Sequence, residues 1–152
     1  MKISNKYYIR IILLFIAFIC FLSCSEAEDV ILKNIRLSVN EGDIIHLADF
    51  TDFEWDSVII CNPGTVRRDL VRLIGEFNLN IDLKKLIIFM YEDNIVHMII
   101  QDYHPEKYLL VDFRINTGIY AVYSKDISSF IVEKHLDYIF LVPIFEPDII
   151  RR

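Results

Sequence analysis

Two apolar runs separated by a very short polar link constrain the fold of this 152-residue chain more than any other feature. Residues 86–91 and 95–100 are almost entirely hydrophobic, and only Glu92, Asp93 and Asn94 lie between them. Two such runs around a link of this length predict an antiparallel β-hairpin. Because nearly every position is apolar, we expect both strands to be central in a sheet and covered on both faces.

The remaining patterns predict further strands and one main helix. Residues 57–61 form an apolar strand ended by Pro63 and Gly64, and the apolar spacing after a capping Thr65 predicts a helix that ends at Gly75. Further strands are predicted over residues 31–39, 109–115, 119–123, 130–134 and 138–142, with a turn over 116–118 and a short helical turn over 124–129. The expected fold is α+β, a largely antiparallel sheet of about 5–7 strands with one main helix packed on a face.

The N-terminal segment has the pattern of a secretory signal. Lys2, Lys6 and Arg10 are its only charges before Ser23, and residues 11–22 form an uncharged apolar run of 12 residues. A membrane-spanning helix needs about 20 apolar residues, whereas the apolar region of a signal peptide has roughly 7–15. The length therefore favours a signal peptide over a transmembrane helix.

The end of this run, Phe21-Leu22-Ser23-Cys24, resembles the lipobox of bacterial lipoproteins, whose cysteine is acylated, for example with palmitate, and becomes the first residue of the mature protein. The resemblance implies that Cys24 anchors the chain to a membrane; an uncleaved anchor and an ordinary secreted protein are the alternatives. Cleavage would also remove Cys20 and leave Cys61 without a partner for an intramolecular disulfide.

This reading divides the chain into a signal peptide over residues 1–23, an acidic tether over 24–30 and a single globular domain over 31–152. The tether resembles the acidic export signal of surface lipoproteins of the Bacteroidetes type. It implies a lipid-anchored location in the bacterial cell envelope, in the outer membrane rather than the inner, with exposure at the cell surface as an option. The membrane and a protein are the partners expected.

The charge balance excludes one class of partner. Residues 24–152 contain 13 basic and 22 acidic side chains, a net charge of −9. A domain this acidic is not drawn electrostatically to nucleic acid or to an anionic bilayer. The chain also lacks the glycine patterns of nucleotide-binding loops, and we expect no cofactor.

A short motif in the first half of the domain gives a second resemblance. A Trp55-Asp56 pair, a short strand, and then Pro63-Gly64 before a helix resemble a group of small, uncharacterised bacterial lipoproteins over about residues 49–75. The resemblance implies the strand and helix unit and no activity. Trp55 beside Asp56 is consistent with a ligand-stacking site, although a core position for the indole, with Asp56 accepting backbone hydrogen bonds, is the alternative.

Two other groups of residues are candidate sites. Thr65, Arg67 and Arg68 lie where a helix begins, so they would bind an anion or an acidic partner unless the arginines pair with acids such as Asp69.

Asp102 and His104 share the end of a strand and would serve a metal or acid–base site, although a third ligand is not evident and no metal site is predicted. His97 alternates with apolar residues and is expected to pack in the core. Cys61 lies in an apolar strand and is expected to be an unreactive thiol.

No recognisable catalytic set accompanies the leader, so the chain is interpreted as a non-enzymatic envelope lipoprotein that binds another protein or has a structural role. Two alternatives remain open: an immunity or inhibitor protein that binds a basic partner, and a small envelope hydrolase that uses acidic residues and His104.

Overall fold

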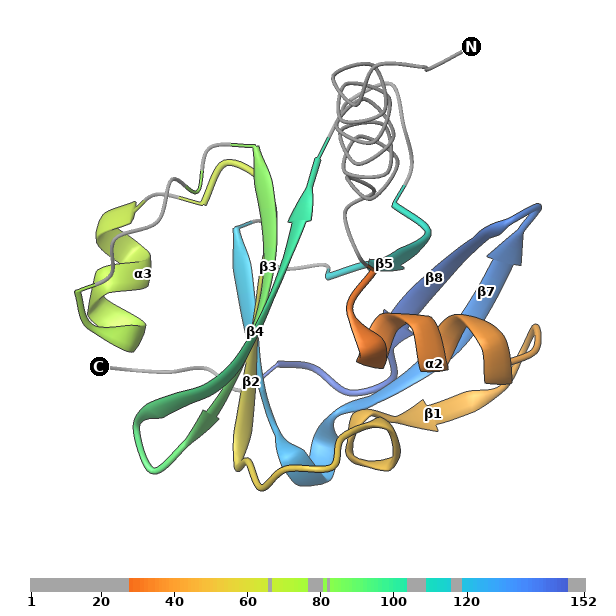
Figure 1. The fold of residues 1–152 in the computed structure, drawn as a ribbon, viewed down its shortest axis with the longest axis horizontal. Helices are drawn as coiled ribbons and strands as arrows, with labels where there is room; N and C mark the ends of the chain where they lie inside the picture. Colours follow the sequence, from red (N-terminus) through yellow and green to blue (C-terminus); the bar gives the residue numbers. More distant parts are fainter. Residues whose placement is uncertain are drawn as a thin grey trace, which may run out of the picture.

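The computed structural model describes residues 28–65, 67–76, 81, 83–103, 109–115 and 119–147 (Figure 1). Its elements in chain order are α2 (Val30–Ser38), β1 (Ile44–His46), the 3-10 turn η1 (Leu47–Phe50), β2 (Ser57–Cys61), α3 (Arg67–Ile74), β3 (Lys84–Tyr91), β4 (Asn94–Asp102), β5 (Val111–Phe113), β6 (Tyr120–Ser124), the 3-10 turn η2 (Lys125–Ile127), β7 (Ser129–His135) and β8 (Tyr138–Pro143).

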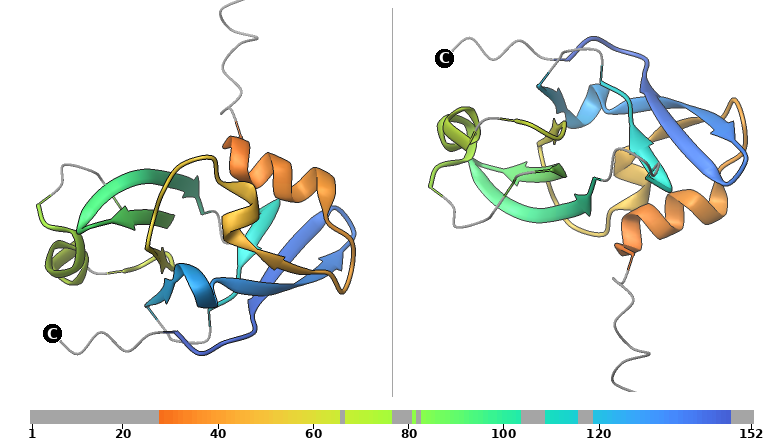
Figure 2. Two further views of the ribbon diagram at one scale, coloured as in Figure 1. Left: turned by 90° about the horizontal axis from the view of Figure 1, so that it is seen from below. Right: turned by 90° about the horizontal axis from the view of Figure 1, so that it is seen from above.

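The described strands form two four-stranded sheets. One has the order β4-β3-β2-β6 and is antiparallel throughout; the other has the order β1-β7-β8-β5, in which only β5 and β8 run parallel. Figures 1 and 2 show α3 on the outer side of the first sheet. The second sheet and α2 lie together on the opposite side of the first sheet. The predicted α+β class with largely antiparallel pairing is confirmed.

The core has two parts because the strands of the first sheet alternate their side chains between two faces. In β2, Val58 and Ile60 belong to the large cluster that joins the two sheets, whereas Ile59 and Cys61 belong to the smaller cluster beneath α3. Fully burying one large aliphatic side chain stabilises the fold by about 1.5–3 kcal/mol. Both clusters therefore hold the first sheet in place, one from each side.

Residues 31–39 were predicted to form a strand, and this is wrong, because most of them lie in α2. Ile31 and Ile35 satisfy both strand alternation and the four-residue helical spacing, so the pattern was ambiguous. Leu32 is buried and Leu37 is 68% exposed, as a helix requires and a strand does not. The helix begins where the carboxylate of Asp29 accepts a hydrogen bond of 2.9 Å from the Ile31 amide.

The apolar hairpin is confirmed, with β3 and β4 joined at Glu92 and Asp93, but only β3 is central. β4 is an edge strand of its sheet, and its Ile95, Val96 and Ile100 are exposed, so the prediction that both strands are covered on both faces is wrong for β4. The sheet continues from β3 to β2 and then to β6, a strand distant in the sequence, and this leaves β4 at the edge.

β5 and β6 were expected to follow one another through a turn over residues 116–118, which lies outside the described residues. They belong to different sheets, because β5 pairs with β8 and β6 with β2. The predicted strand over 57–61, the helix ending at Gly75 and the last two strands are all present. Gly75 has φ +82°, a conformation that favours glycine, and its amide closes the helix on the Val71 carbonyl at 3.0 Å.

Candidate functional site

Trp55 and Asp56 make contacts within the protein, and the buried indole is not placed to stack on a ligand. The indole of Trp55 is 2% exposed, packs edge-on against Phe89 with 5.2 Å between ring centroids, and donates a hydrogen bond of 2.9 Å to the Thr51 hydroxyl. The Asp56 carboxylate accepts a hydrogen bond of 2.8 Å from the Glu92 amide. The pair therefore anchors the turn between β3 and β4 to the segment before β2.

Thr65 and Arg68 contact other groups of the protein. The Thr65 hydroxyl is buried and lies 2.6 Å from the Asn62 carbonyl and 3.0 Å from that of Ile119, so it faces the loop and not the helix. Arg67 and Arg68 are exposed, and the Nε of Arg68 lies 3.9 Å from a carboxylate oxygen of Asp69. The threonine is thus engaged by backbone carbonyls and does not face a ligand.

Of the other candidates, Asp102 is paired with Lys84 across the β3–β4 ladder. His104 and Cys24 lie outside the described residues. Cys61 is fully buried, and burial raises the pKa of its thiol to about 12, which agrees with the expectation of an unreactive thiol.

β4 presents the most prominent unpartnered surface of the described chain. It is nine residues long, it pairs with β3 on one side only, and no described strand pairs with its other side. Ile95, Val96 and Ile100 are 40%, 41% and 43% exposed, which is unusual for isoleucine and valine in a β-strand. Proteins generally shorten, charge or cover such an edge, because its backbone groups and apolar side chains can pair with another chain.

A groove runs beside the last residues of this edge. It has a volume of about 410 Å³ and an even mixture of polar and apolar walls. Its lining comes from three places: Glu28, Asp29 and Leu32 at the start of α2, residues 98–102 of β4, and residues 109–111 at β5. The exposed Ile100 of the edge and the exposed Leu110 of the opposite wall therefore border the same groove.

The wall formed by α2 is tied to β4 by one side-chain contact. The Asp29 carboxylate, which also caps α2, lies 3.0 Å from Nε2 of His97. The His97 ring is half-buried, with Phe53 and Phe89 at 5.2 and 6.0 Å between centroids, as the predicted packing role requires. The start of α2 is consequently fixed beside the edge strand.

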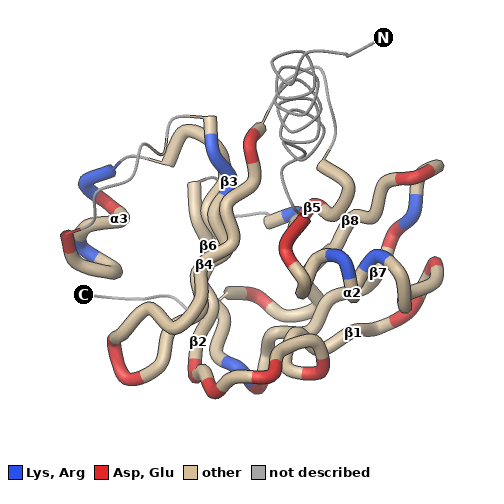
Figure 3. The backbone as a smooth tube through the Cα atoms, in the orientation of Figure 1, with Lys and Arg blue, Asp and Glu red and all other residues tan. Residues whose placement is uncertain are grey.

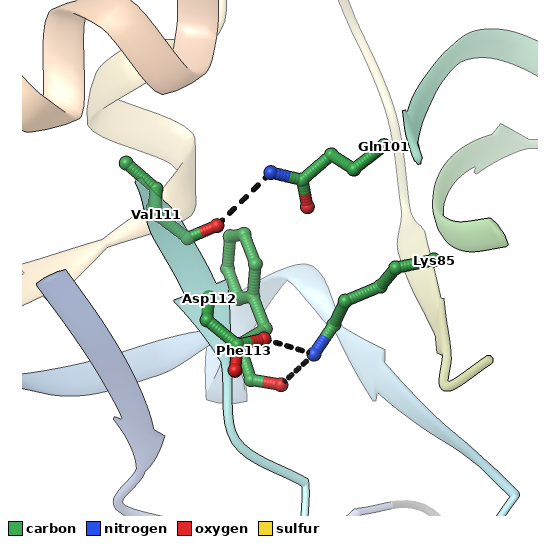
Figure 4. A network of polar contacts seen from close by, with 5 residues as sticks. All are labelled: Lys85, Gln101, Val111, Asp112 and Phe113. Atoms are coloured by element: carbon green, nitrogen blue, oxygen red, sulfur yellow. Dashed lines mark hydrogen bonds and ion pairs between the residues drawn. The ribbon is translucent and has the colours of Figure 1, made fainter. Parts of the chain in front are cut away.

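The opposite wall is held by a polar network between the sheets (Figure 4). Lys85 and Gln101 are direct neighbours across β3 and β4, and both reach toward β5. The Gln101 amide donates to the Val111 carbonyl at 3.0 Å, while the Lys85 ammonium contacts the Asp112 carboxylate and the Phe113 carbonyl. These contacts cross from one sheet to the other and set the distance between β4 and β5.

Lys85 is 3% exposed, an unusual environment for an ammonium group. Burial lowers its pKa, and the neighbouring Asp112 carboxylate opposes that shift. A buried lysine in a cleft is sometimes a catalytic residue, but here both partners of the ammonium belong to the protein itself. The network therefore positions the groove wall.

Acidic side chains occupy both ends of β4 (Figure 3). Asp56, Glu92 and Asp93 lie at its turn, and Glu28, Asp29 and Asp102 surround its other end. Some of this charge is neutralised inside the protein, because Arg36 binds Glu28 through two hydrogen bonds of 2.9 and 2.7 Å, which lower the pKa of Glu28, and Lys84 pairs with Asp102. The centre of the edge is apolar and its ends are acidic.

Sequence reasoning identified the two apolar runs but not the groove. Lys85 carries a detectable signal, since it shares the parity of the buried Ile87 and Phe89 and is therefore aimed into the core. Its partner Asp112 comes from a strand of another sheet, and no local pattern identifies such a contact.

Comparison with known proteins gave no match to any family model, any curated protein or any solved structure. Among the described helices, none has the length and apolar character needed to cross a bilayer. Within the same residues, histidine, cysteine and carboxylate side chains do not gather in groups of three or more that could hold a metal ion.

Proposed function

We propose that this chain is a lipid-anchored protein of the bacterial cell envelope, without catalytic activity, that binds another protein by strand addition at β4. The observation that carries the proposal is the nine-residue edge strand β4, which pairs only with β3 among the described strands, has three exposed apolar side chains and borders a groove at Ile100. Strand addition gives affinity through main-chain hydrogen bonds and specificity through the side chains beside the edge.

The proposed anchor would place the groove near the membrane. Asp29 lies five positions after Cys24, and a fully extended chain over five positions spans at most about 18 Å. Because Asp29 lines the groove, an acylated Cys24 would hold this part of the groove wall within that distance of the anchored cysteine. The anchor and the groove are thus neighbours in the proposed arrangement.

The anchor is tested with Cys24→Ala expressed from the native gene. Labelling with a palmitate analogue should mark the wild type only, and the variant should keep its signal peptide and lack the label. A variant of unchanged mass that remains in the membrane would overturn the lipid anchor and favour an uncleaved helix.

The binding edge is tested by placing one lysine on it. Ile100→Lys sets a charge on the exposed side of β4, a device by which natural sheets prevent edge pairing. The control is Ile44→Lys on β1, the edge of the other sheet, where the isoleucine is 61% exposed. A photo-crosslinker is placed at Val96 in whole cells. A discrete adduct should form in the wild type and in the Ile44→Lys control and should disappear in Ile100→Lys. An adduct that persists in Ile100→Lys would refute the binding edge.

A further inference from the structure

We infer that the occupant of β4 is an extended segment of another protein with an apolar centre and basic side chains at its ends. The inference rests on the proposed binding function and adds the chemistry of the partner. It is argued from three properties of the edge: its length, its apolar centre and its acidic ends.

The length and the exposed side chains define the centre of the occupant. A strand rises about 3.4 Å per residue, so the nine residues of β4 offer at most about 30 Å of edge, with a bulge at Val96 opposite Phe89 and Met90. Ile95, Val96 and Ile100 lie along it and are each about 40% exposed. A segment of similar length with apolar side chains would remove this surface from water.

The charges define the ends of the occupant. Asp56, Glu92 and Asp93 lie around the turn that precedes β4, and Asp102 closes the strand at its other end. Opposite charges that face each other across paired strands stabilise the pairing, and like charges destabilise it. A lysine or arginine at one end of the incoming segment would therefore meet Glu92 and Asp93, and one at the other end would meet Asp102, whose charge Lys84 partly offsets.

The same charges disfavour a second copy of this chain as the occupant. In antiparallel pairing of β4 with itself, the Glu92-Asp93 turn of one copy would lie beside Asp102 of the other, and the symmetry of the pair would repeat this contact. Lys84 offsets part of the charge of Asp102, but both ends of the interface would still place the two acids of one turn beside that carboxylate. A basic segment from a different protein avoids that repulsion.

The inference is tested with two synthetic nine-residue peptides, KVTVTVTVK and EVTVTVTVE, which differ only in their terminal residues. Binding to the full acylated chain in nanodiscs of zwitterionic lipid is measured by fluorescence anisotropy at low salt. The basic peptide should bind at least tenfold more tightly than the acidic one, and the difference should shrink at high salt because exposed charges are screened.

A charge change at the turn provides the matched control. Glu92→Lys should reduce the preference for the basic peptide severalfold, whereas Asp137→Lys, which makes the same charge change in the exposed turn between β7 and β8, should leave it unchanged. Equal binding of the two peptides, or tighter binding of the acidic one, would overturn the inference.

Two further outcomes separate this inference from the proposed function. If neither peptide binds while Ile100→Lys still abolishes the cellular adduct at Val96, the partner chemistry is wrong and the binding edge stands. If the Val96 adduct joins two copies of this chain, the basic partner is refuted in favour of self-association. Loss of peptide binding in Ile100→Lys, with retention in Ile44→Lys, supports both proposals.

Discussion

Lys85 makes a buried polar contact between the two sheets. Its ammonium group reaches from β3 to the Asp112 carboxylate and the Phe113 carbonyl of β5. No apolar side chain could satisfy these two oxygens, so the position combines core burial with a directional contact. Gln101 adds a second crossing contact to Val111, while its own carbonyl oxygen is buried without a partner among the described residues.

Replacing Lys85 with methionine should destabilise the protein. The change leaves a buried carbonyl and a partly buried carboxylate without their donor, and a loss of about 1–3 kcal/mol in the free energy of unfolding is expected. Adding Asp112→Asn should recover part of that loss, because the uncompensated charge is removed. Urea unfolding measures both; a single variant as stable as the wild type would contradict the role of Lys85.

The same variant gives a pH dependence with a definite sign. Burial lowers the pKa of Lys85 from 10.5, so between the lowered value and 10.5 the unfolded chain binds the proton more tightly than the folded chain does. The contribution of Lys85 to stability therefore grows as the pH rises through that window and is lost as the pH falls. The difference in unfolding free energy between the wild type and Lys85→Met should be larger at about pH 9.5 than at about pH 7.

Tyr123 is a second buried residue, and the effect of its hydroxyl on stability can be tested. The ring is 1% exposed, burial raises the pKa of its hydroxyl to about 12, and the hydroxyl finds no hydrogen-bond partner among the described residues. Removing an unsatisfied buried hydroxyl is neutral or stabilises by up to about 1–2 kcal/mol. Thermal unfolding of Tyr123→Phe should show an unchanged or higher Tm, and a clear fall would mean that the hydroxyl is bonded in solution.

At the level of elements, α2 depends on Asp29 in two ways, as its cap and as the partner of His97. Asp29→Ala removes both and should cost about 0.5–2 kcal/mol in the free energy of unfolding. Asp29→Asn keeps an oxygen for the cap and loses the negative charge, so it should retain most of the stability. Equal losses in the two variants, measured by urea unfolding, would show that the charge and not the cap is decisive.

The elements also show why part of this fold could be predicted and part could not. Residues 57–61 and β3 were identified from continuous apolar runs, because burial on two faces favours apolar residues at every position. β4 has the same composition, although three of its apolar side chains are exposed. The helix α2 was mistaken for a strand because Ile31 and Ile35 fit either periodicity, and only the burial of Leu32 separates them. Periodicity describes one element at a time.

The candidate site could not be predicted from the sequence, for a related reason. The open side of β4 follows from the pairing of β2 with β6, whose residues are about 60 positions apart, and nothing local to either strand encodes it. The groove likewise needs α2, β4 and β5 in one place. The residues named from motifs, Trp55 and Thr65, were found where local signals are strong, and they serve the fold.

For the whole molecule, the structure combines a well-packed interior with a long edge strand, β4, on which no other described strand pairs beyond β3. Both sheets share a core, and α3 packs on the outer face of the first sheet. The side-chain contacts of His97, Lys85 and Gln101 fix the walls of the groove beside β4. An acidic domain with a short proposed tether to the membrane would present this edge to partners close to the lipid surface. The central claim is that β4 is covered by another protein in the cell.

Amide hydrogen exchange tests this claim most directly. Exchange over residues 94–102 of β4 is compared between the purified chain and the chain in membranes isolated with its native partners. Residues 44–46 of β1, an edge strand of the second sheet, are the internal control. If a partner covers β4, exchange over β4 should be slower in the native membranes and unchanged over β1, and the β4 protection should be lost in Ile100→Lys. Equal exchange over β4 in the two samples would contradict this claim.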